Sequence, residues 1–273
     1  MKKKFLAIAL VAALAVAITA CGSSASSDGA GSAAGEAASE VAAVQEKGTL
    51  VVGITDFEPM DYKDADGNWV GFDADMATAF AESLGVKVEF TEIDWDNKIL
   101  ELDNGTVDCI WNGMTLTDEV TSAMDCSNPY CNNAQIIILP TKIADQYKDV
   151  DSLKDLTFAV ESGSAGQKEG EANGLKLQEV QSQSAALMEV AATTCDGAII
   201  DSLMAAAMVG EGTSYEDLTY TIGLNSEEYG VGFRKGSDLV EKLNEFFKTS
   251  YADGSMQKTA EKYGVQAALI EQK

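Results

Sequence analysis

The strongest constraint on the fold is an alternation of strand-like and helix-like segments along most of the 273 residues. "TLVVGI" at 49–54 is an apolar run typical of a buried strand, and "FDADMATAFAESLG" carries apolar residues at helical spacing. The strand-like "VKVEFTEI", a short helical pattern in "DNKILELDNG" and the strand-like "VDCIW" follow in order. Because parallel strands need crossover connections, this order predicts an α/β unit with a mainly parallel sheet.

The same alternation restarts after "AQIIILP" at 134–140, with strands predicted in "LTFAV", "KLQEV" and "DGAII" and helices between and after them. One more apolar strand, "EYGVGFRKG", precedes two helices at 238–252 and 255–263. Helices without strands of their own make no third domain, so we expect them to return to the first unit. The chain then crosses twice between two lobes, predicted as 47–137 plus 230–273 and 138–229.

The first residues indicate export. Three lysines at 2–4 precede an apolar stretch at 5–18 that is too short for a stable spanning helix, so residues 1–20 are predicted to be a signal peptide. "ITAC" is similar to a bacterial lipobox, which predicts lipidation of Cys21; an ordinary cleaved signal with an unmodified cysteine is the alternative. Residues 21–46 begin with a Gly/Ser/Ala-rich run and are predicted to form a flexible tether.

Composition excludes several functions. A net charge of −25 opposes binding to nucleic acid or anionic lipid headgroups, so membrane attachment is expected through the lipid. The chain has no histidine, which removes Ser-His-Asp and Cys-His nucleophiles and the usual His-ligated metal sites, and we expect no metal or cofactor. Cys126 and Cys131 are spaced for a small disulfide loop, although free thiols, as expected for Cys109 and Cys195 in apolar runs, are preferred.

Polar groups follow four of the predicted strands. The segments are "TDFEPMDY" from 55, "WNGMTLTDEV" from 111, "ESGSAG" from 161, and Asp201. In open α/β sheets, ligands lie beyond the carboxyl ends of the strands. Polar groups converging from two lobes therefore predict a small, polar and charged or zwitterionic ligand.

A resemblance to a known family rests on motifs in one order over residues 48–263. The motifs are "LVVGITDFEPMDYKDADG", "GFDADMATAFAESLGVKVEF", "DWDNKILELDNGTVDCIWNGMTLTDE", "SNPY", "DLTFAVESGSAG", "DGAIIDSLMAA" and "EEYGVGFRKGS". On these motifs the chain resembles family 3 of the extracytoplasmic solute-binding proteins, which deliver polar amino acids to ABC importers. This resemblance implies a two-lobed periplasmic-binding-protein-like fold of type II, with two hinge strands and Venus-flytrap closure. We place the hinges near 134–140 and 228–233.

The resemblance also implies a biological setting. The protein is expected to be a monomer on the extracytoplasmic face of the membrane, held by its lipid, with an amino acid as ligand and an ABC permease and ATPase as partners. It would not be an enzyme. Two alternatives remain at this point: a dehydratase-like enzyme on the same fold with Glu161 as acid, and a binding lobe for a sensory partner.

The resemblance assigns roles to several residues. Asp201 would receive the ligand ammonium, besides or instead of capping a helix. The turn Ser164, Ala165 and Gly166 would hold the ligand carboxylate through backbone N–H groups, and a plain N-cap role of Ser164 is compatible with this. Phe57, after Asp56 in the first loop, would be an aromatic wall or a core residue.

In "WNGMTLTDEV" most relatives have an arginine at the position of Val120, which clamps the carboxylate. Lys98 is therefore predicted to be the main counter-ion of the ligand, in contact with either its α-carboxylate or an acidic or amide side chain. Neutral contacts are expected from the rest of this segment and its surroundings: Trp111 (ligand contact or packing), Asn112, the Gly113 backbone, Met114, Thr115 and Thr117, with Glu161 at the cleft edge. "DADGN" at 64–68 lacks the rest of a calcium loop and predicts a hairpin turn.

Overall fold

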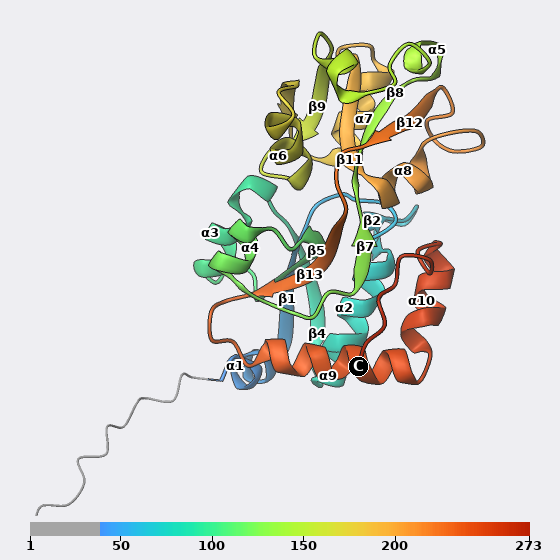
Figure 1. Cartoon of the computed structure of the whole chain (residues 1–273). Coiled ribbons are helices and arrows are strands. Elements are labelled where there is room, and N and C mark those ends of the chain that lie inside the picture. The colour runs from blue at the N-terminus through green and yellow to red at the C-terminus, as the bar shows by residue number, and fades with distance from the viewer. Residues whose placement is uncertain (1–38) are drawn as a thin grey trace, which may run out of the picture. The chain divides into compact units, whose positions relative to one another are not determined.

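The computed structural model describes residues 39–273, which form two sheets with helices around them (Figure 1). The predicted signal peptide, Cys21 and most of the predicted tether lie outside the described residues. The predicted α/β fold of two lobes is present: each sheet has its own strands and helices, and the chain passes between the sheets twice.

The first sheet has the strand order β4-β1-β5-β13-β6, with β7 paired to β13. Its three parallel strands are those predicted from the alternation, and β13 runs antiparallel to β5 and to the short strands β6 and β7. The strands are β1 (Thr49–Ile54), β4 (Lys87–Glu92), β5 (Cys109–Thr115), β6 (Asp125–Cys126), β7 (Cys131–Asn133) and β13 (Glu227–Phe233).

The second sheet has the order β10-β9-β11-β8-β12. Strands β10, β9 and β11 are parallel, whereas β8 and β12 are antiparallel to their neighbours. Strand β12 was not predicted. The strands are β8 (Gln135–Pro140), β9 (Thr157–Glu161), β10 (Lys176–Val180), β11 (Gly197–Asp201) and β12 (Leu218–Gly223).

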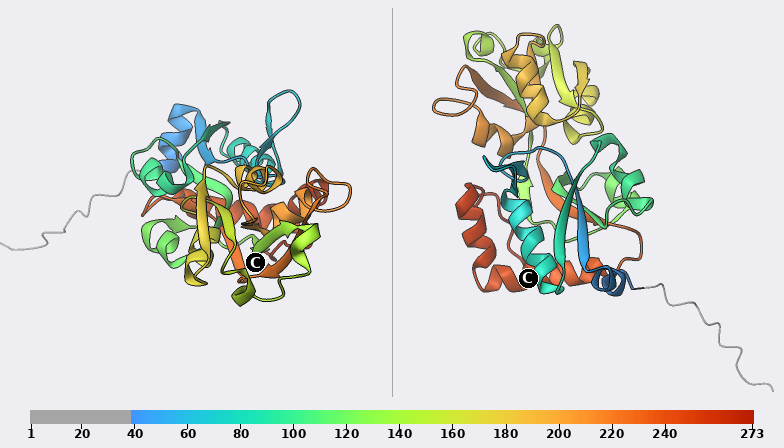
Figure 2. Two further views of the ribbon diagram at one scale, coloured as in Figure 1. Left: turned by 90° about the horizontal axis from the view of Figure 1, so that it is seen from above. Right: turned by 180° about the vertical axis from the view of Figure 1, so that it is seen from behind.

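Helices cover both sheets as their apolar faces require. The two C-terminal helices return to the first lobe, as predicted: α10 packs on α2 and on α9, and the views of Figure 2 agree with this. The first lobe carries α2 (Phe72–Ser83), α3 (Lys98–Asp103), α4 (Asp118–Ala123), α9 (Leu239–Ala252) and α10 (Ser255–Tyr263). The second carries α5 (Thr141–Ala144), α6 (Ala165–Ala172), α7 (Gln183–Ala191) and α8 (Ser202–Met208).

Two local features were predicted, a hairpin turn at residues 64–68 and free cysteine thiols. Residues 64–68 form the predicted hairpin turn between β2 (Tyr62–Lys63) and β3 (Trp69–Val70), where Asp64 accepts hydrogen bonds from the backbone N–H groups of Asp66 and Asn68 at 2.9 and 2.8 Å. The four cysteines among the described residues are free thiols.

The chain passes between the two sheets close to the predicted hinges. Strand β7 ends in the first sheet at Asn133 and β8 begins in the second at Gln135, so the first crossing is at Ala134, inside the predicted hinge 134–140 and before the predicted lobe boundary at 137. The second crossing lies at 224–226, before β13, rather than at 229. "AQIIILP" is one apolar run without a turn residue, and nothing in its pattern marks where it changes sheet.

Helix α1 (Glu40–Lys47) corrects the predicted extent of the tether, which was expected to reach residue 46. Ser39 caps the helix by accepting from the N–H of Ala42 at 3.0 Å, and Gly48 ends it with φ +75°. Val44 is buried against the first lobe. Val41 packs against the same core, so the prediction of a flexible tether from the small residues overlooked a capped helix with two apolar contacts.

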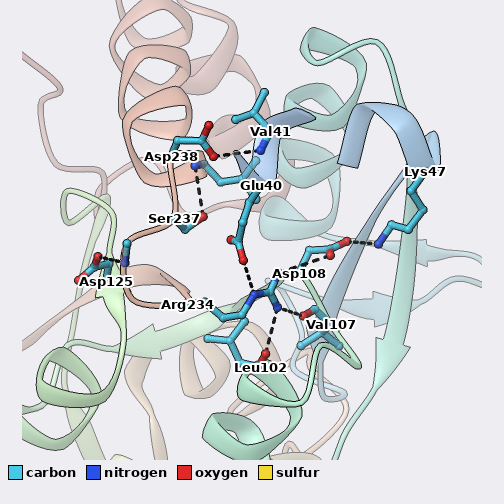
Figure 3. A network of polar contacts seen from close by, with 12 residues as sticks. Glu40, Val41, Lys47, Leu102, Val107, Asp108, Asp125, Arg234, Ser237 and Asp238 are labelled. Carbon is cyan, nitrogen blue, oxygen red and sulfur yellow. Dashed lines mark hydrogen bonds and ion pairs between the residues drawn. The ribbon is translucent and has the colours of Figure 1, made fainter. Parts of the chain in front are cut away.

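Polar contacts around Arg234 hold α1 to the first lobe (Figure 3). The guanidinium pairs with Glu40 of α1 and donates to the carbonyls of Leu102 and Val107 at 3.0 and 2.7 Å. Lys47, at the other end of the helix, pairs with Asp108 at 2.6 Å. The half-buried guanidinium of Arg234 therefore connects α1 to the end of α3. Because Arg234 directly follows β13, it also connects both to that strand.

Replacing Arg234 by alanine is expected to lower the free energy of unfolding by about 2–4 kcal/mol, because Glu40 and two carbonyls lose their partner in a partly buried place. Urea denaturation measures the difference. Lys242→Ala, which removes a lysine from an exposed pair on α9, is the control and should change it by less than about 0.5 kcal/mol. Equal effects of the two variants would contradict this role of Arg234.

Candidate functional site

A small cavity lies where the strand ends of the two sheets meet, lined by both lobes. Its volume is about 20 Å³, little more than a water molecule requires, so any larger ligand needs the lobes to separate or side chains to move. Ten of the predicted ligand residues line it. From the first lobe they are Lys98, Asn112, Gly113, Met114, Thr115 and Thr117; from the second they are Glu161, Ser164, Ala165 and Asp201.

Asp201 is the last residue of β11 and is buried, with 3% of its surface exposed. Its carboxylate accepts hydrogen bonds from the amides of Asn133 and Gln135 on one oxygen and of Gln183 on the other. It stands at the N-cap position of α8 without capping it. Burial, and next the carboxylate of Glu227, raise the pKa of Asp201 to about 8.

Glu161 ends β9 and is equally buried, at 3% exposure. Its Oε1 atom has no hydrogen-bond partner among residues 39–273. Burial, and next the charge of Asp201, raise the pKa of Glu161 to about 8; Thr55 and Lys98 act in the opposite direction. An unpartnered buried carboxyl oxygen is costly, and Glu161 is the residue of the cavity lining that carries one.

Lys98, the first residue of α3, is 5% exposed and reaches across to the second lobe. Its ammonium donates to the carbonyl of Trp95 at 3.2 Å and to that of Gly163 at 2.9 Å. Burial lowers its pKa. Because an ammonium has three donors, one N–H remains for a ligand.

The N-terminus of α6 borders the cavity beside Lys98. Ser164 caps the helix by accepting from the N–H of Gln167 at 3.1 Å, so the capping interpretation holds. The N–H groups of Ala165 and Gly166 have no intrahelical partner by their position in the first turn. Gly166 itself does not line the cavity. A Cβ there would lie 2.8 Å from Oε1 of Gln135 and 3.2 Å from the carbonyl oxygen of Ile199, so a side chain at this position would displace the Gln135 amide.

The polar segment 112–117 is largely bound to the protein itself. The Asn112 amide exchanges hydrogen bonds with Thr55, at 3.0 Å to its backbone N–H and 2.9 Å to its hydroxyl. The backbone N–H of Gly113, expected to serve a ligand, donates instead to Asp73 at 2.7 Å. This bond and the φ of +55° turn the Gly113 backbone toward the core of the first lobe.

The two threonines of the segment have partners as well. Thr115 donates to Glu227 at 2.9 Å. Thr117 caps α4 by accepting from the N–H of Val120 at 3.2 Å, which leaves its hydroxyl hydrogen free to donate. Val120 lines the cavity and is buried, so an aliphatic group stands where the resemblance implied a cation.

Three predicted ligand residues besides Gly166 lie away from the cavity. Phe57 is in the core, edge-on to Tyr229 with ring centroids 6.3 Å apart. Trp111 is fully buried between rings of the first lobe, including Phe247 at 5.5 Å. Asp56 accepts from the hydroxyl of Ser184 at 3.1 Å, beside the cavity rather than in it. Phe57 and Trp111 thus lie in the packed core of the first lobe, which was the alternative interpretation of each.

Other lining residues were missed by the sequence reasoning. Trp95, Gln135 and Gln183 line the cavity but were not among the predicted ligand residues, although the amides of Gln135 and Gln183 surround Asp201. Lys168 lines the outer side and pairs with Glu119 across the lobes. The available signal was the single amide of Gln135 at the start of the apolar run "QIIIL", since a buried amide needs a hydrogen-bond partner.

The sequence matches the bacterial extracellular solute-binding proteins, family 3, over residues 50–266. The chain belongs to this family. The arginine-binding extracellular protein ArtP of Bacillus subtilis (strain 168) is 31% identical over 229 residues, covering 80% of this chain and 86% of that protein. A probable histidine-binding protein of Neisseria gonorrhoeae is 29% identical over 228 residues, covering 80% and 85%. Among residues 39–273, no helix is both long and apolar enough to cross a membrane.

Solved structures of the family share the two-lobed fold of type II. The ancestral amino acid-binding protein AncCDT-1, a precursor of cyclohexadienyl dehydratase, has a TM-score of 0.76 and 31% identity, covering 82% of this chain and 99% of that one. An ABC uptake transporter substrate-binding protein of Streptococcus pneumoniae with bound histidine has a TM-score of 0.76 and 32% identity, covering 85% and 98%. The predicted fold class is confirmed.

The buried carboxyls of this family member should make its stability depend on pH. A carboxyl whose pKa is raised in the folded state favours folding below its unfolded pKa, and this contribution is lost as pH rises through the folded pKa. For Glu161 that window runs from the model-peptide value of about 4.5 to about 8. We expect Glu161→Gln to raise the free energy of unfolding of the ligand-free protein by about 3 kcal/mol at pH 8, and by less than about 1 kcal/mol at pH 4.

Urea denaturation at both pH values tests this expectation. Glu241→Gln, at an exposed position on α9, is the matched control and should behave like the wild type at both. A Glu161→Gln effect that is the same at pH 4 and pH 8 would show that the carboxyl of Glu161 does not hold its proton through burial.

Proposed function

We propose that this protein captures an amino acid outside the cell membrane and delivers it to the permease and ATPase subunits of an ABC importer. The observation that carries the proposal is the pairing of opposite polarities in one buried cavity. Asp201 and Glu161 present carboxyls, while Lys98 and the first turn of α6 present donors. A zwitterion with an ammonium and a carboxylate matches both sides.

The relatives support this ligand class. By name they bind arginine and histidine, and the pneumococcal structure holds histidine. A binding role needs closure of the lobes around the ligand and no catalytic group, so we propose no reaction. In this proposal Asp201 receives the ammonium, and the carboxylate lies against Lys98 and the first turn of α6, where Ala165 lines the cavity.

We also propose that the mature protein is a monomeric lipoprotein attached through Cys21. The lipobox-like "ITAC" and the small residues behind it support an anchor followed by a short tether. Since α1 is fixed to the first lobe, the tether would reach the protein there, and the second lobe would remain free to move during closure.

A thermal-shift screen of the mature protein, lacking its lipid, against the common amino acids tests the binding role. At a concentration of about 100 times the dissociation constant, a ligand stabilises by roughly 2.7 kcal/mol, a rise of about 5–10 °C for a protein of this size. Asp201→Asn should abolish the rise, whereas Asp151→Asn, at an exposed position of the second lobe, should keep it. No rise with any amino acid would refute the proposal.

The anchor is tested by fractionating cells that express the full chain. The wild type is expected in the membrane fraction, and Cys21→Ala in the soluble extracytoplasmic or secreted fraction, because no thiol remains there to carry the lipid. Cys126→Ala, which removes a cysteine of the folded part, should stay with the membrane. Membrane retention of Cys21→Ala after signal cleavage would show that the anchor is something else.

A further inference from the structure

The charges lining the cavity are unequal. Besides Lys168 at its outer side, which pairs with Glu119, the ionisable side chains of the lining are Lys98, Glu161 and Asp201. Two carboxyls therefore face one ammonium inside the cavity. Val120, whose side chain is apolar, adds no second cation. When both carboxyls are ionised, a neutral zwitterion leaves one negative charge in excess, whereas a ligand of net charge +1 balances it.

The hydrogen-bonding capacity of the two carboxyls also favours a ligand with two positive groups. A carboxylate has about four lone-pair positions, and three of those of Asp201 are occupied by the amides of Asn133, Gln135 and Gln183. One position remains there for an ammonium. Oε1 of Glu161, by contrast, accepts nothing from residues 39–273. The greater unused acceptor capacity of the cavity therefore belongs to Glu161.

A second, wider groove next to the cavity is acidic as well. This groove shares Thr115, Thr117, Ala165 and Lys168 with the cavity. Its other lining residues include four carboxylates, against the one cation Lys168: Asp118, Glu169, Glu227 and Glu228. A groove lined with carboxylates attracts and concentrates cations.

We infer that the site prefers a basic amino acid, and that Glu161 accepts the second positive group of the ligand while Asp201 accepts the first. This inference rests on the proposed function and names its substrate class. The ligand carboxylate then needs only the remaining N–H of Lys98 and the first turn of α6, so a clamping arginine at position 120 is unnecessary. In such a complex the two buried carboxyls and Lys98 are all neutralised.

Titration calorimetry with matched pairs of ligands tests the inference. L-arginine and L-citrulline have nearly the same shape and differ by one positive charge; L-lysine and L-norleucine form a second pair. We expect the charged member of a pair to bind about tenfold tighter or more, and Glu161→Gln to reduce that ratio to about threefold or less. Glu241→Gln removes an exposed carboxylate far from the cavity and should leave the ratio unchanged.

A pH series supplies a second measurement that needs no variant. Glu161 faces Asp201, Lys98 and Thr55, and its carboxyl accepts a cation fully only when it is ionised. Because its pKa is raised to about 8, the ratio of citrulline to arginine dissociation constants should grow from pH 6 to pH 9. A ratio that stays constant or falls over this range would overturn the role of Glu161.

The outcomes separate this inference from the function on which it rests. If neutral or acidic amino acids bind as tightly as basic ones, or if Glu161→Gln leaves the arginine preference intact, the inference is wrong and the binding function stands. If no amino acid binds to the folded wild type, the proposed function itself fails. A preference for the charged ligands that depends on Glu161 supports both.

Discussion

The hydrogen bonds that Glu227 accepts where the two lobes join determine the geometry of the site. Its Oε1 accepts from Thr115, Asn133 and Gln135 at 2.9, 2.7 and 2.8 Å, and its Oε2 accepts from Asn225 at 2.8 Å. These donors lie on or beside both crossings between the sheets. Because the amides of Asn133 and Gln135 also donate to Asp201, the hinge and the proposed ammonium acceptor form one network. A change in the relative position of the lobes would therefore change the surroundings of Asp201 directly.

Without a ligand, burying several carboxyls close together in this network costs free energy. Glu227, Asp201 and Glu161 bring three carboxyls close together, and burial raises the pKa of Asp201 and Glu161 to about 8. Neutralisation by protons is one way to lower the cost of burying like charges, and a ligand ammonium is another. In the proposed complex only the second also adds hydrogen bonds to both lobes, so the charge of the ligand would favour closure. Binding and proton release are then linked.

The sequence predicted the strand and helix order well because each element carries its own periodicity, as in "TLVVGI" and α2. It predicted Asp201 and Glu161 because polar residues directly after buried strands have few structural reasons to be there. It failed where the deciding contact comes from another lobe or another element. Gln135 and Gln183 matter only because they meet at Asp201, Phe57 is enclosed because Gly113 has no side chain, and α1 is fixed by Arg234 from nearly two hundred residues away.

The central claim is that Glu161 and Asp201 hold protons near neutral pH when no ligand is bound. Titration of the side-chain carboxyl carbons by 13C NMR in the ligand-free protein measures this directly, with Glu161→Gln and Asp201→Asn to assign the two signals. The account predicts that both groups titrate with apparent pKa values near 8 and that a bound cationic ligand keeps both ionised well below that. Two carboxyls that titrate in the ordinary range, near about 4, would contradict it.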